Sequence, residues 1–324
     1  MTKRFSIFTI FQCLAVCVVF AQQPEDSVRV HDLPELQVQA SAITTSTSLV
    51  QTLSAAQLEK LNVLQASDAM KHLSGVQVKD YGGVGGLKTV SIRSLGANYT
   101  AVAVDGIAVS DYQTGQIDLG RFSLENIESI RLNIGESDNI FQPARNQALG
   151  GLIQLISQNS LSSESKREEW KAGLKAGSWQ LWNPFVTYSR AFNPQWNINL
   201  SSSFLTTKGD YPFQIHYGQT DSTSWHRRIN SDVKRGNAEL NLNGKFRNGG
   251  RLNAKLYAFL SERGIPGRVI FYNPYSGEKV KDCNLFAQVN YNQSLNEKWQ
   301  WQANAKGSRS VMNDWGAGLD NQYA

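Results

Sequence analysis

The clearest pattern in this chain is an alternation of apolar and polar residues that begins near Trp170. From residue 196 to 204, every second residue lies on one largely apolar face, and the residues between them are Asn197, Asn199, Ser201 and Ser203. The stretches 237–246, 252–260 and 299–306 repeat this pattern. A period of two residues predicts β-strands with two unlike faces. Each stretch has roughly ten residues, the length that a tilted strand needs to cross a bilayer.

The polar face of these predicted strands favours a membrane barrel over a soluble β-sandwich, which also alternates. Asn, Gln and Lys fill that face, as expected where a strand lines a water-filled lumen. Aromatic residues gather near the predicted strand ends, as in the interfacial girdle of a barrel, namely Trp170, Trp179, Trp182, Trp196 and Trp299.

The connections between the predicted strands are unequal. Short turns are expected at 193–195, 247–250 and 295–298, and long loops at 208–234 and 264–281. Membrane barrels alternate in this way, with the long loops outside the cell. We therefore predict about seven antiparallel transmembrane β-barrel strands within residues 159–324.

Residues 52–158 combine helix signals with short strand candidates and predict a compact α+β domain. Ser54 followed by Gln57 is a capping-box signature, and Ser67 could cap a second helix that ends at Gly75. Asp105-Gly106 predicts a hairpin turn. The strand candidates are Val76–Lys79, Thr89–Arg93, Thr100–Val104, Ile107–Val109, Ile130–Ile134 and Leu152–Ile156.

The first fifty residues predict an exported chain. Residues 1–21 combine Lys3 and Arg4 with an apolar run and Ala21, which is typical of a signal peptide; the run is too short for a spanning helix. Residues 22–51 are polar and predict a flexible arm. Within this arm, apolar and polar residues alternate over one short extended patch, made of Leu36, Gln37, Val38, Gln39 and Ala40.

Composition argues against several function classes. A formal charge of +5, spread along the chain, does not indicate a nucleic-acid binder. Cys283 is the one cysteine after the signal peptide, so we expect neither an internal disulfide nor a thiolate metal site. The four histidines lack zinc-ligand spacing, and no Gly-Lys-Ser/Thr follows the glycines at 82–86. We predict neither an enzyme nor a cofactor or metal.

Four segments in the order and spacing found here resemble the plug domain of TonB-dependent outer-membrane receptors. They are DYGGVGGLKTVSIRS, TAVAVDGIAVSD, NIESIRLNIGES and ALGGLIQLIS, and LPELQVQA upstream resembles the TonB box of that family. DYQTGQIDL, GDYPF and ERGIPG are similar to cobalamin-receptor-like members of Bacteroidetes type.

The resemblance implies a plug inside a barrel of twenty-two strands, of which this chain would hold the first part. It implies that TonB binds Leu36–Ala40 by strand addition. By the same resemblance, the substrate binds at the plug apex, through two loops that contain Tyr81, Gly82 and Gly83 and Asp111, Tyr112 and Gln113. The implied function is TonB-dependent import of a scarce nutrient, such as cobalamin or a metal chelate, across the bacterial outer membrane.

Two alternatives stay open at this point. A passive porin would need neither plug nor box, and a truncated receptor could serve as a soluble adaptor without transport. The sequence does not identify the substrate: cobalamin, an iron chelate, haem and a glycan fragment all fit. For the patch Leu36–Ala40, a plain linker is the alternative to a binding segment.

Overall fold

The computed structural model describes residues 49–111, 115–135, 140–158, 168–216, 223–267 and 277–315. The predicted signal peptide and the patch Leu36–Ala40 lie outside the described residues, as do Tyr112 and Gln113. No helix within the described ranges is long and apolar enough to cross a membrane.

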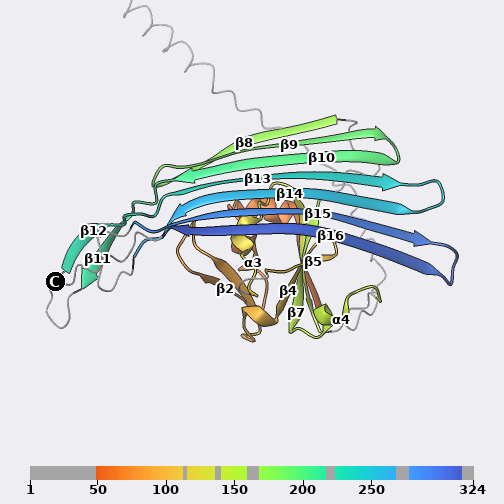
Figure 1. Ribbon diagram of the computed structural model, residues 1–324, viewed down its shortest axis with the longest axis horizontal. Coiled ribbons are helices and arrows are strands. Elements are labelled where there is room, and N and C mark those ends of the chain that lie inside the picture. The colour runs from red at the N-terminus through yellow and green to blue at the C-terminus, as the bar shows by residue number, and fades with distance from the viewer. Residues whose placement is uncertain are drawn as a thin grey trace, which may run out of the picture. The chain divides into compact units, whose positions relative to one another are not determined.

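The first part of the described chain, which we call the plug, is a mixed five-stranded sheet with short helices (Figure 1). The strand order is β1-β6-β7-β4-β5; β4 and β7 are parallel and the other pairs are antiparallel. The sheet consists of β1 (Leu49–Ser54), β4 (Thr100–Val104), β5 (Ile107–Val109), β6 (Ile127–Ile134) and β7 (Gly151–Ser157). Around it lie α2 (Ala55–Leu61), α3 (Ala66–Met70), α4 (Ala144–Gln147) and the hairpin of β2 (Val76–Asp80) and β3 (Lys88–Ile92).

Local sequence explains most of the plug. Ser54 and Gln57 form the predicted capping box at the start of α2. Asp105 and Gly106, with φ of 50° and 83°, form the predicted turn between β4 and β5. The prediction for α3 was wrong in detail: its N-cap is Gln65, and Ser67 is buried within the helix. Most of the large side chains that are fully buried in the plug are apolar, including Met70, Ile92, Ile130, Leu132 and Ile153, and the polar side chains of Gln65 and Asn126 are buried with them.

The second part, which we call the wall, is a seven-stranded antiparallel sheet in the order β16-β15-β14-β13-β10-β9-β8. Its strands have ten to sixteen residues: β8 (Glu168–Gly177), β9 (Leu181–Asn193), β10 (Trp196–Thr207), β13 (Val233–Lys245), β14 (Arg251–Gly264), β15 (Lys279–Ser294) and β16 (Gln300–Trp315). The predicted number of strands is confirmed for the described residues, and Figure 1 shows them as one layer over the plug.

The ends of the wall differ as predicted. The turns after β9, β13 and β15 are short. The connections after β10 and β14 are long, and the first of them carries the hairpin of β11 (Pro212–His216) and β12 (Thr223–Arg227). We call these the short-turn end and the long-loop end.

Aromatic side chains cross the wall at its short-turn end. Ring contacts link Trp196 to Phe246, Phe246 to Tyr291, and Tyr291 to Trp301, with centroids 5.4, 5.8 and 5.0 Å apart. Trp299, just before β16, is exposed. A row of this kind is what an interfacial girdle requires, because such rings prefer the boundary between lipid and water.

Candidate functional site

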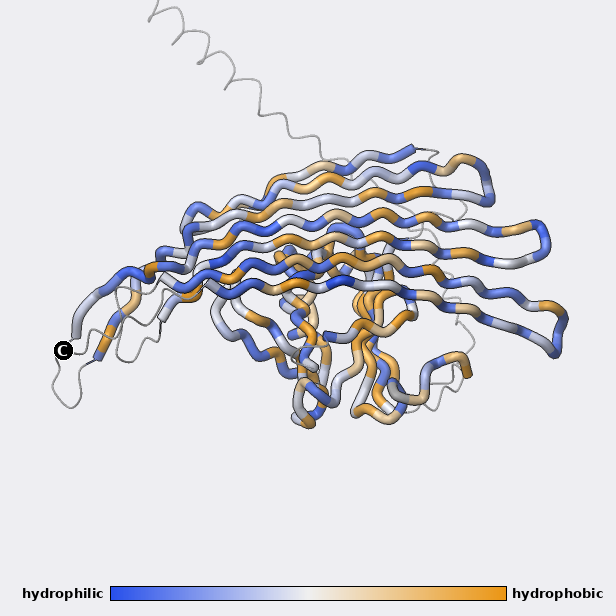
Figure 2. Tube along the Cα trace, in the orientation of Figure 1, coloured by the Kyte–Doolittle hydropathy of each residue, from blue (hydrophilic) through white to orange (hydrophobic). Residues whose placement is uncertain are grey.

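The wall buries its polar face and exposes its apolar face, which is the reverse of a sheet in a soluble protein. Asn199 and Asn241 are 0% and 1% exposed, whereas Leu200 and Leu256 are 45% and 53% exposed. The polar face meets the plug and the apolar face is open. Figure 2 shows the alternation of hydropathy along the wall strands. This arrangement suits a sheet with lipid on one side and a wet lumen on the other.

Lys255 of β14 lies at the centre of the contact between wall and plug. Its Nζ is 3.1 Å from Asp105 Oδ2 of the plug and 3.0 Å from Glu239 Oε2 of β13, and it also donates to Ser157 Oγ. Ser157 donates from its backbone N–H and its hydroxyl to Asp105, and Asn126 donates to Glu239. We call these five residues the clamp. All three charged side chains are exposed by 8% or less.

The clamp joins plug to wall through charge rather than through apolar packing. One ammonium group between two carboxylates leaves a formal charge of −1 in a nearly closed site. Loss of the ammonium would leave two buried carboxylates without their counter-ion, a change that is strongly destabilising. Sequence reasoning missed these residues. The available signal was two charged residues, Glu239 and Lys255, in the middle of membrane-length strands.

Other wall side chains bind backbone carbonyl oxygens of the plug. Arg235 Nη1 donates to the carbonyls of Val84 and Gly120, at 3.3 and 3.0 Å. Arg263 Nη1 donates to the carbonyl of Gly85 at 2.8 Å. A bond to a carbonyl oxygen depends on backbone position and not on side-chain identity, so these contacts hold the plug loops in place whatever residues those loops carry.

The two edges of the plug sheet are tied to the wall unequally. The β4–β5 edge is bonded at three places: Gln288 Nε2 to Val104 O, Lys255 Nζ to Asp105 Oδ2, and Lys306 Nζ to Ala108 O. At the opposite edge, β1 pairs only with β6. In the described part of the chain, the side-chain hydrogen bonds of β1 run from Gln51 to Ser74 and between Ser54 and Gln57, all within the plug. Among the described residues, the β4–β5 edge therefore has side-chain bonds to the wall that β1 itself lacks.

The loop predicted at the plug apex between β2 and β3 lies at the long-loop end of the wall. Gly85 is bound by Arg263, which immediately precedes the end of β14. Gly82 and Gly83 donate their N–H groups to Asp80 Oδ1 at 3.0 and 2.8 Å, and both have positive φ. Tyr81 is 57% exposed. The loop is thus a tight turn that presents one aromatic ring.

The second predicted apex loop, Ser110 to Gly115, follows β5, and Asp111 is its predicted site residue within the described part of the chain. Asp111 Oδ2 is 4.0 Å from Arg121 Nη2, and Arg121 Nη1 donates to Asn284 of β15 at 3.0 Å. This loop is therefore also next to the wall. That Tyr81, Gly82, Gly83 and Asp111 bind substrate stays a prediction.

Asp68 of α3 helps to hold the hairpin that carries the glycine loop. Its Oδ1 is 2.9 Å from Lys71 Nζ and 3.2 Å from Lys88 Nζ of β3. Burial by itself raises the pKa of Asp68. The two ammonium groups together lower this pKa by a larger amount, so it lies below the ordinary value of an aspartate. Arg93 and Arg131 of the plug are both exposed, and Glu125 pairs with Lys175 of the wall.

No group of three or more His, Cys, Asp or Glu side chains that could hold a metal ion occurs among the described residues. Within that part of the chain, the prominent polar arrangement is the contact between plug and wall.

Comparison with known proteins agrees with this arrangement. Residues 42–146 match the family model of the TonB-dependent Receptor Plug Domain. The "Vitamin B12 transporter BtuB" of Vibrio vulnificus is 34% identical over 103 residues, which cover 31% of this chain and 16% of that protein.

Solved structures share the fold over most of the chain. The siderophore receptor PiuA from Acinetobacter baumannii aligns with a TM-score of 0.60 and 15% identity, over 82% of this chain and 37% of that one. The FrpB iron transporter from Neisseria meningitidis aligns with a TM-score of 0.63 and 11% identity, over 81% and 41%. This chain thus spans less than half the length of these relatives. Residues 42–146 of the chain thus match the plug domain of the TonB-dependent receptors, and the seven wall strands that follow share the fold of the solved receptor structures.

Proposed function

We propose that this chain forms the plug and part of the wall of a transporter that imports a scarce nutrient, a corrinoid or a metal chelate, with energy delivered through TonB. The named relatives support this substrate class: one is a vitamin B12 transporter, and others are a siderophore receptor and an iron transporter. Substrate binds the loops at Tyr81–Gly83 and Asp111–Gln113 on the long-loop side, and TonB binds Leu36–Ala40.

The observation that carries the proposal is the polar contact between plug and wall. A plug held by ion pairs and hydrogen bonds in a wet lumen can exchange those bonds for bonds to water. The apolar part of the contact consists, in the described residues, of Tyr257 and Phe259, which belong to the hydrophobic cluster of the plug, and of Phe286, which packs against it. The passive porin that we considered as an alternative does not account for the plug.

The unequal edges of the plug sheet suggest where movement begins. The arm that contains Leu36–Ala40 leads directly into β1. β1 is an edge strand with a largely exposed burial pattern, so a pull on the arm acts first on its pairing with β6. Because the clamp fixes the other edge, β1 separates while β4 and β5 stay on the wall. Moving elements are expected at such low-stability positions.

A test uses proline in the box. Val38→Pro removes a backbone N–H that strand addition needs, so uptake of cyanocobalamin or ferric citrate into cells should fall to background. Binding of the same ligand to the cell surface should not change. Ser46→Pro, in the arm but outside the box, is the matched control and should keep uptake. Normal uptake in Val38→Pro cells would refute the proposed role of the box.

A second test asks whether the edge strand β1 must separate from β6 during uptake. Thr52 and Arg131 are cross-strand partners in β1 and β6, and both are exposed. Thr52→Cys with Arg131→Cys, in a Cys283→Ser background, should block uptake when oxidised and restore it on reduction. The control pair is Gln77→Cys with Ser91→Cys, which links β2 to β3 and should leave uptake unchanged. Equal uptake with both disulfides formed would show that β1 does not separate.

A further inference from the structure

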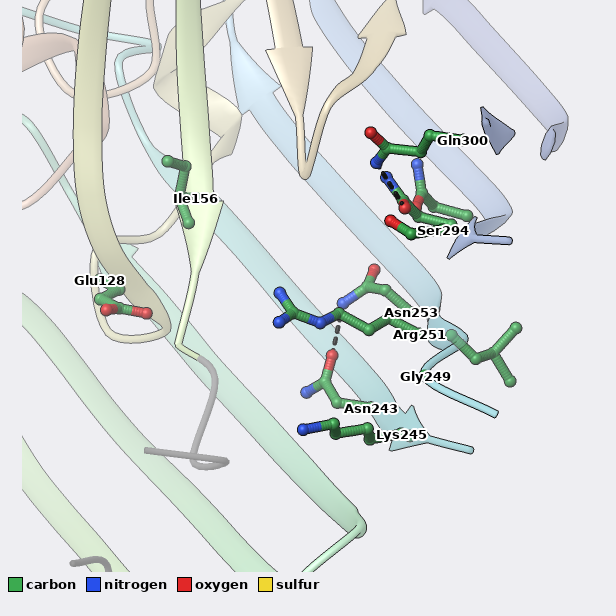
Figure 3. Close-up of a pocket in the computed structure, with 13 residues that line it drawn as sticks. Glu128, Ile156, Asn243, Lys245, Gly249, Arg251, Asn253, Ser294 and Gln300 are labelled. Atoms are coloured by element: carbon green, nitrogen blue, oxygen red, sulfur yellow. Dashed lines mark hydrogen bonds between the residues drawn. The ribbon is translucent and has the colours of Figure 1, made fainter. Parts of the chain in front are cut away.

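The two boundaries of the apolar face of the wall differ in chemistry. At the short-turn end, this face carries the row of aromatic rings that includes Trp196. Two cations of that end, Lys245 and Arg251, point the other way and line a recess of about 870 Å³ on the inner face, opposite Glu128 of the plug (Figure 3). At the long-loop end, by contrast, lysines lie on the outer face.

One row of outward-pointing residues crosses the wall at its long-loop end. Its members lie directly opposite one another on neighbouring strands, and we call them the lysine row: Thr206 of β10, Lys234 of β13, Glu262 of β14, Lys281 of β15 and Asn313 of β16. Successive residues of a strand point to opposite faces. Since Arg235 and Arg263, the next residues along β13 and β14, bind the plug, the lysine row points away from it.

The lysine row lies one membrane thickness from the aromatic row. On β10, Thr206 is ten residues from Trp196, which begins the strand at the short-turn end. A tilted strand crosses the hydrocarbon core of a bilayer in about 9–11 residues. The outer positions between the two rows include the exposed Leu200 and Leu256. The ammonium groups of the lysine row are therefore at the level of the lipid headgroups, where long lysine side chains keep their charge in contact with water.

A groove opens directly beside the lysine row. It has a volume of about 410 Å³ and extends from Lys234 and Lys281 onto the apolar part of the outer face. Phe204 and Leu260 line it and are 48% and 58% exposed. Gly236 of β13 lies directly between them, opposite Phe204 on one side and Leu260 on the other. Because glycine has no side chain, the face is hollow between these two large residues.

The lysine row has a positive charge in excess. Lys281 Nζ is 3.2 Å from Glu262 Oε2 and 6.0 Å from the centre of the Trp315 ring. Lys234 lies opposite Glu262 on the other side, is exposed, and forms no ion pair with a residue of the described chain. Two ammonium groups against one carboxylate leave a formal charge of +1 at the end of an apolar groove. This combination suits a ligand with an apolar chain and an anionic head.

We propose that the groove and the lysine row together bind one membrane lipid with an anionic phosphate headgroup. Its acyl chain lies in the groove along Phe204 and Leu260, and its phosphate accepts hydrogen bonds from Lys234 and Lys281. The groove alone would accept any acyl chain, and the lysine row adds the preference for an anion. The inference rests on the outer face of the wall meeting lipid and does not depend on import.

The test is native mass spectrometry of the full-length receptor. The receptor is incubated in detergent with equal amounts of phosphatidylglycerol and phosphatidylcholine that have identical acyl chains, and the retained lipid is identified. Phosphatidylglycerol should be retained preferentially. Lys234→Gln should reduce this preference about fivefold, the effect of one ammonium group at a membrane surface, and Lys234→Arg should keep it. Lys298→Gln, in a turn at the short-turn end, is the matched control and should leave the preference unchanged.

A variant of the groove tests the contribution of the acyl chain. A β-carbon at Gly236 would meet Phe204 Cδ2 and the carbonyl oxygen of Ser203 at 3.8 Å, an ordinary contact, so the wall accommodates Gly236→Val. The added side chain takes the place of about two methylene groups of the lipid. Retention of both lipids should therefore fall about tenfold, while the preference for the anionic headgroup stays the same.

Several outcomes would overturn the proposal. Equal retention of the two lipids, or an unchanged preference in Lys234→Gln, would overturn the role of the lysine row. Unchanged retention in Gly236→Val would overturn the role of the groove. Receptor dimers without retained lipid would assign the groove to a second copy of the chain. None of these measurements uses uptake, so a receptor that retains the lipid and does not import would count against the proposed function alone.

Discussion

The plug and the wall follow opposite rules for what they bury. In the plug, most of the large side chains that are fully buried are apolar, among them Met70 and Ile130, with Gln65 and Asn126 as polar exceptions. In the wall, Asn197 and Asn199 are completely buried while Leu200 is exposed. The same chain therefore folds its first part against water and its second part against lipid.

This difference determines how strongly the two parts hold each other. Polar side chains of the wall contact the plug through hydrogen bonds and ion pairs. Beside them, Tyr257 and Phe259 of β14 join the hydrophobic core of the plug, with Phe122 at 5.7 Å from Tyr257. Removal of one partner from a buried ion pair leaves an uncompensated charge and is strongly destabilising. The free energy of an apolar contact instead decreases in proportion to the buried area that is removed. The predictions below probe this contrast.

The largest effect is expected at the clamp. Lys255→Met leaves Asp105 and Glu239 buried without their counter-ion, which should weaken attachment of the plug by about 3–5 kcal/mol. The measurement is the urea midpoint for plug release in vesicles, together with entry of a large antibiotic into cells.

Neutralising all three charges is the control for that variant. Lys255→Met with Asp105→Asn and Glu239→Gln removes the unpaired carboxylates, and most of the lost stability should return. Lys171→Ala breaks the exposed pair with Glu59, at 3.3 Å, and should change little. If Lys255→Met behaved like Lys171→Ala, the clamp would contribute nothing to attachment.

The next effect is expected on the outer face of the wall. Leu256 is exposed in the middle of β14. Leu256→Arg should destabilise the barrel by about 2–4 kcal/mol if this face meets lipid near the middle of the bilayer. Heat-modifiable mobility on gels reports barrel stability. Leu256→Ile is the control, and a neutral outcome for Leu256→Arg would mean that water covers this face.

Much of this contrast could be predicted from sequence. The alternation of apolar and polar residues predicted the wall strands and the polarity of their two faces. It could do so because successive residues of a strand point to opposite faces, so two unlike surroundings produce an alternating sequence. The capping box and the Asp105-Gly106 turn were also predictable, since both depend on nearby residues. The α3 start was wrong because Ser67 satisfied the local signature, although the fold buries it within the helix.

Contacts between distant segments could not be predicted in this way. The clamp joins residues 105, 126, 157, 239 and 255, and the fold alone brings them together. On the inner face of the wall, asparagines 197, 243, 253, 290 and 304 lie opposite one another on five strands. Their alignment depends on register, which hydropathy does not specify to the residue. Predicting these contacts needs strand pairing, which is a property of the three-dimensional structure.

The smallest effect concerns pH and lies within the plug. Asp68 has a lowered pKa in the folded state because Lys71 and Lys88 stabilise its carboxylate beyond the cost of burial. A lowered folded pKa means that its contribution is complete above the unfolded value of about 4, and is lost as pH falls through the folded value. Asp68→Asn should therefore reduce plug stability by about 1 kcal/mol at pH 7, and the difference from the unsubstituted receptor should shrink in acid. Urea midpoints of plug release between pH 7 and pH 3 provide the measurement, with Glu59→Gln as the exposed control. A difference that stays constant across this range would show that Asp68 acts through its shape and not through its charge.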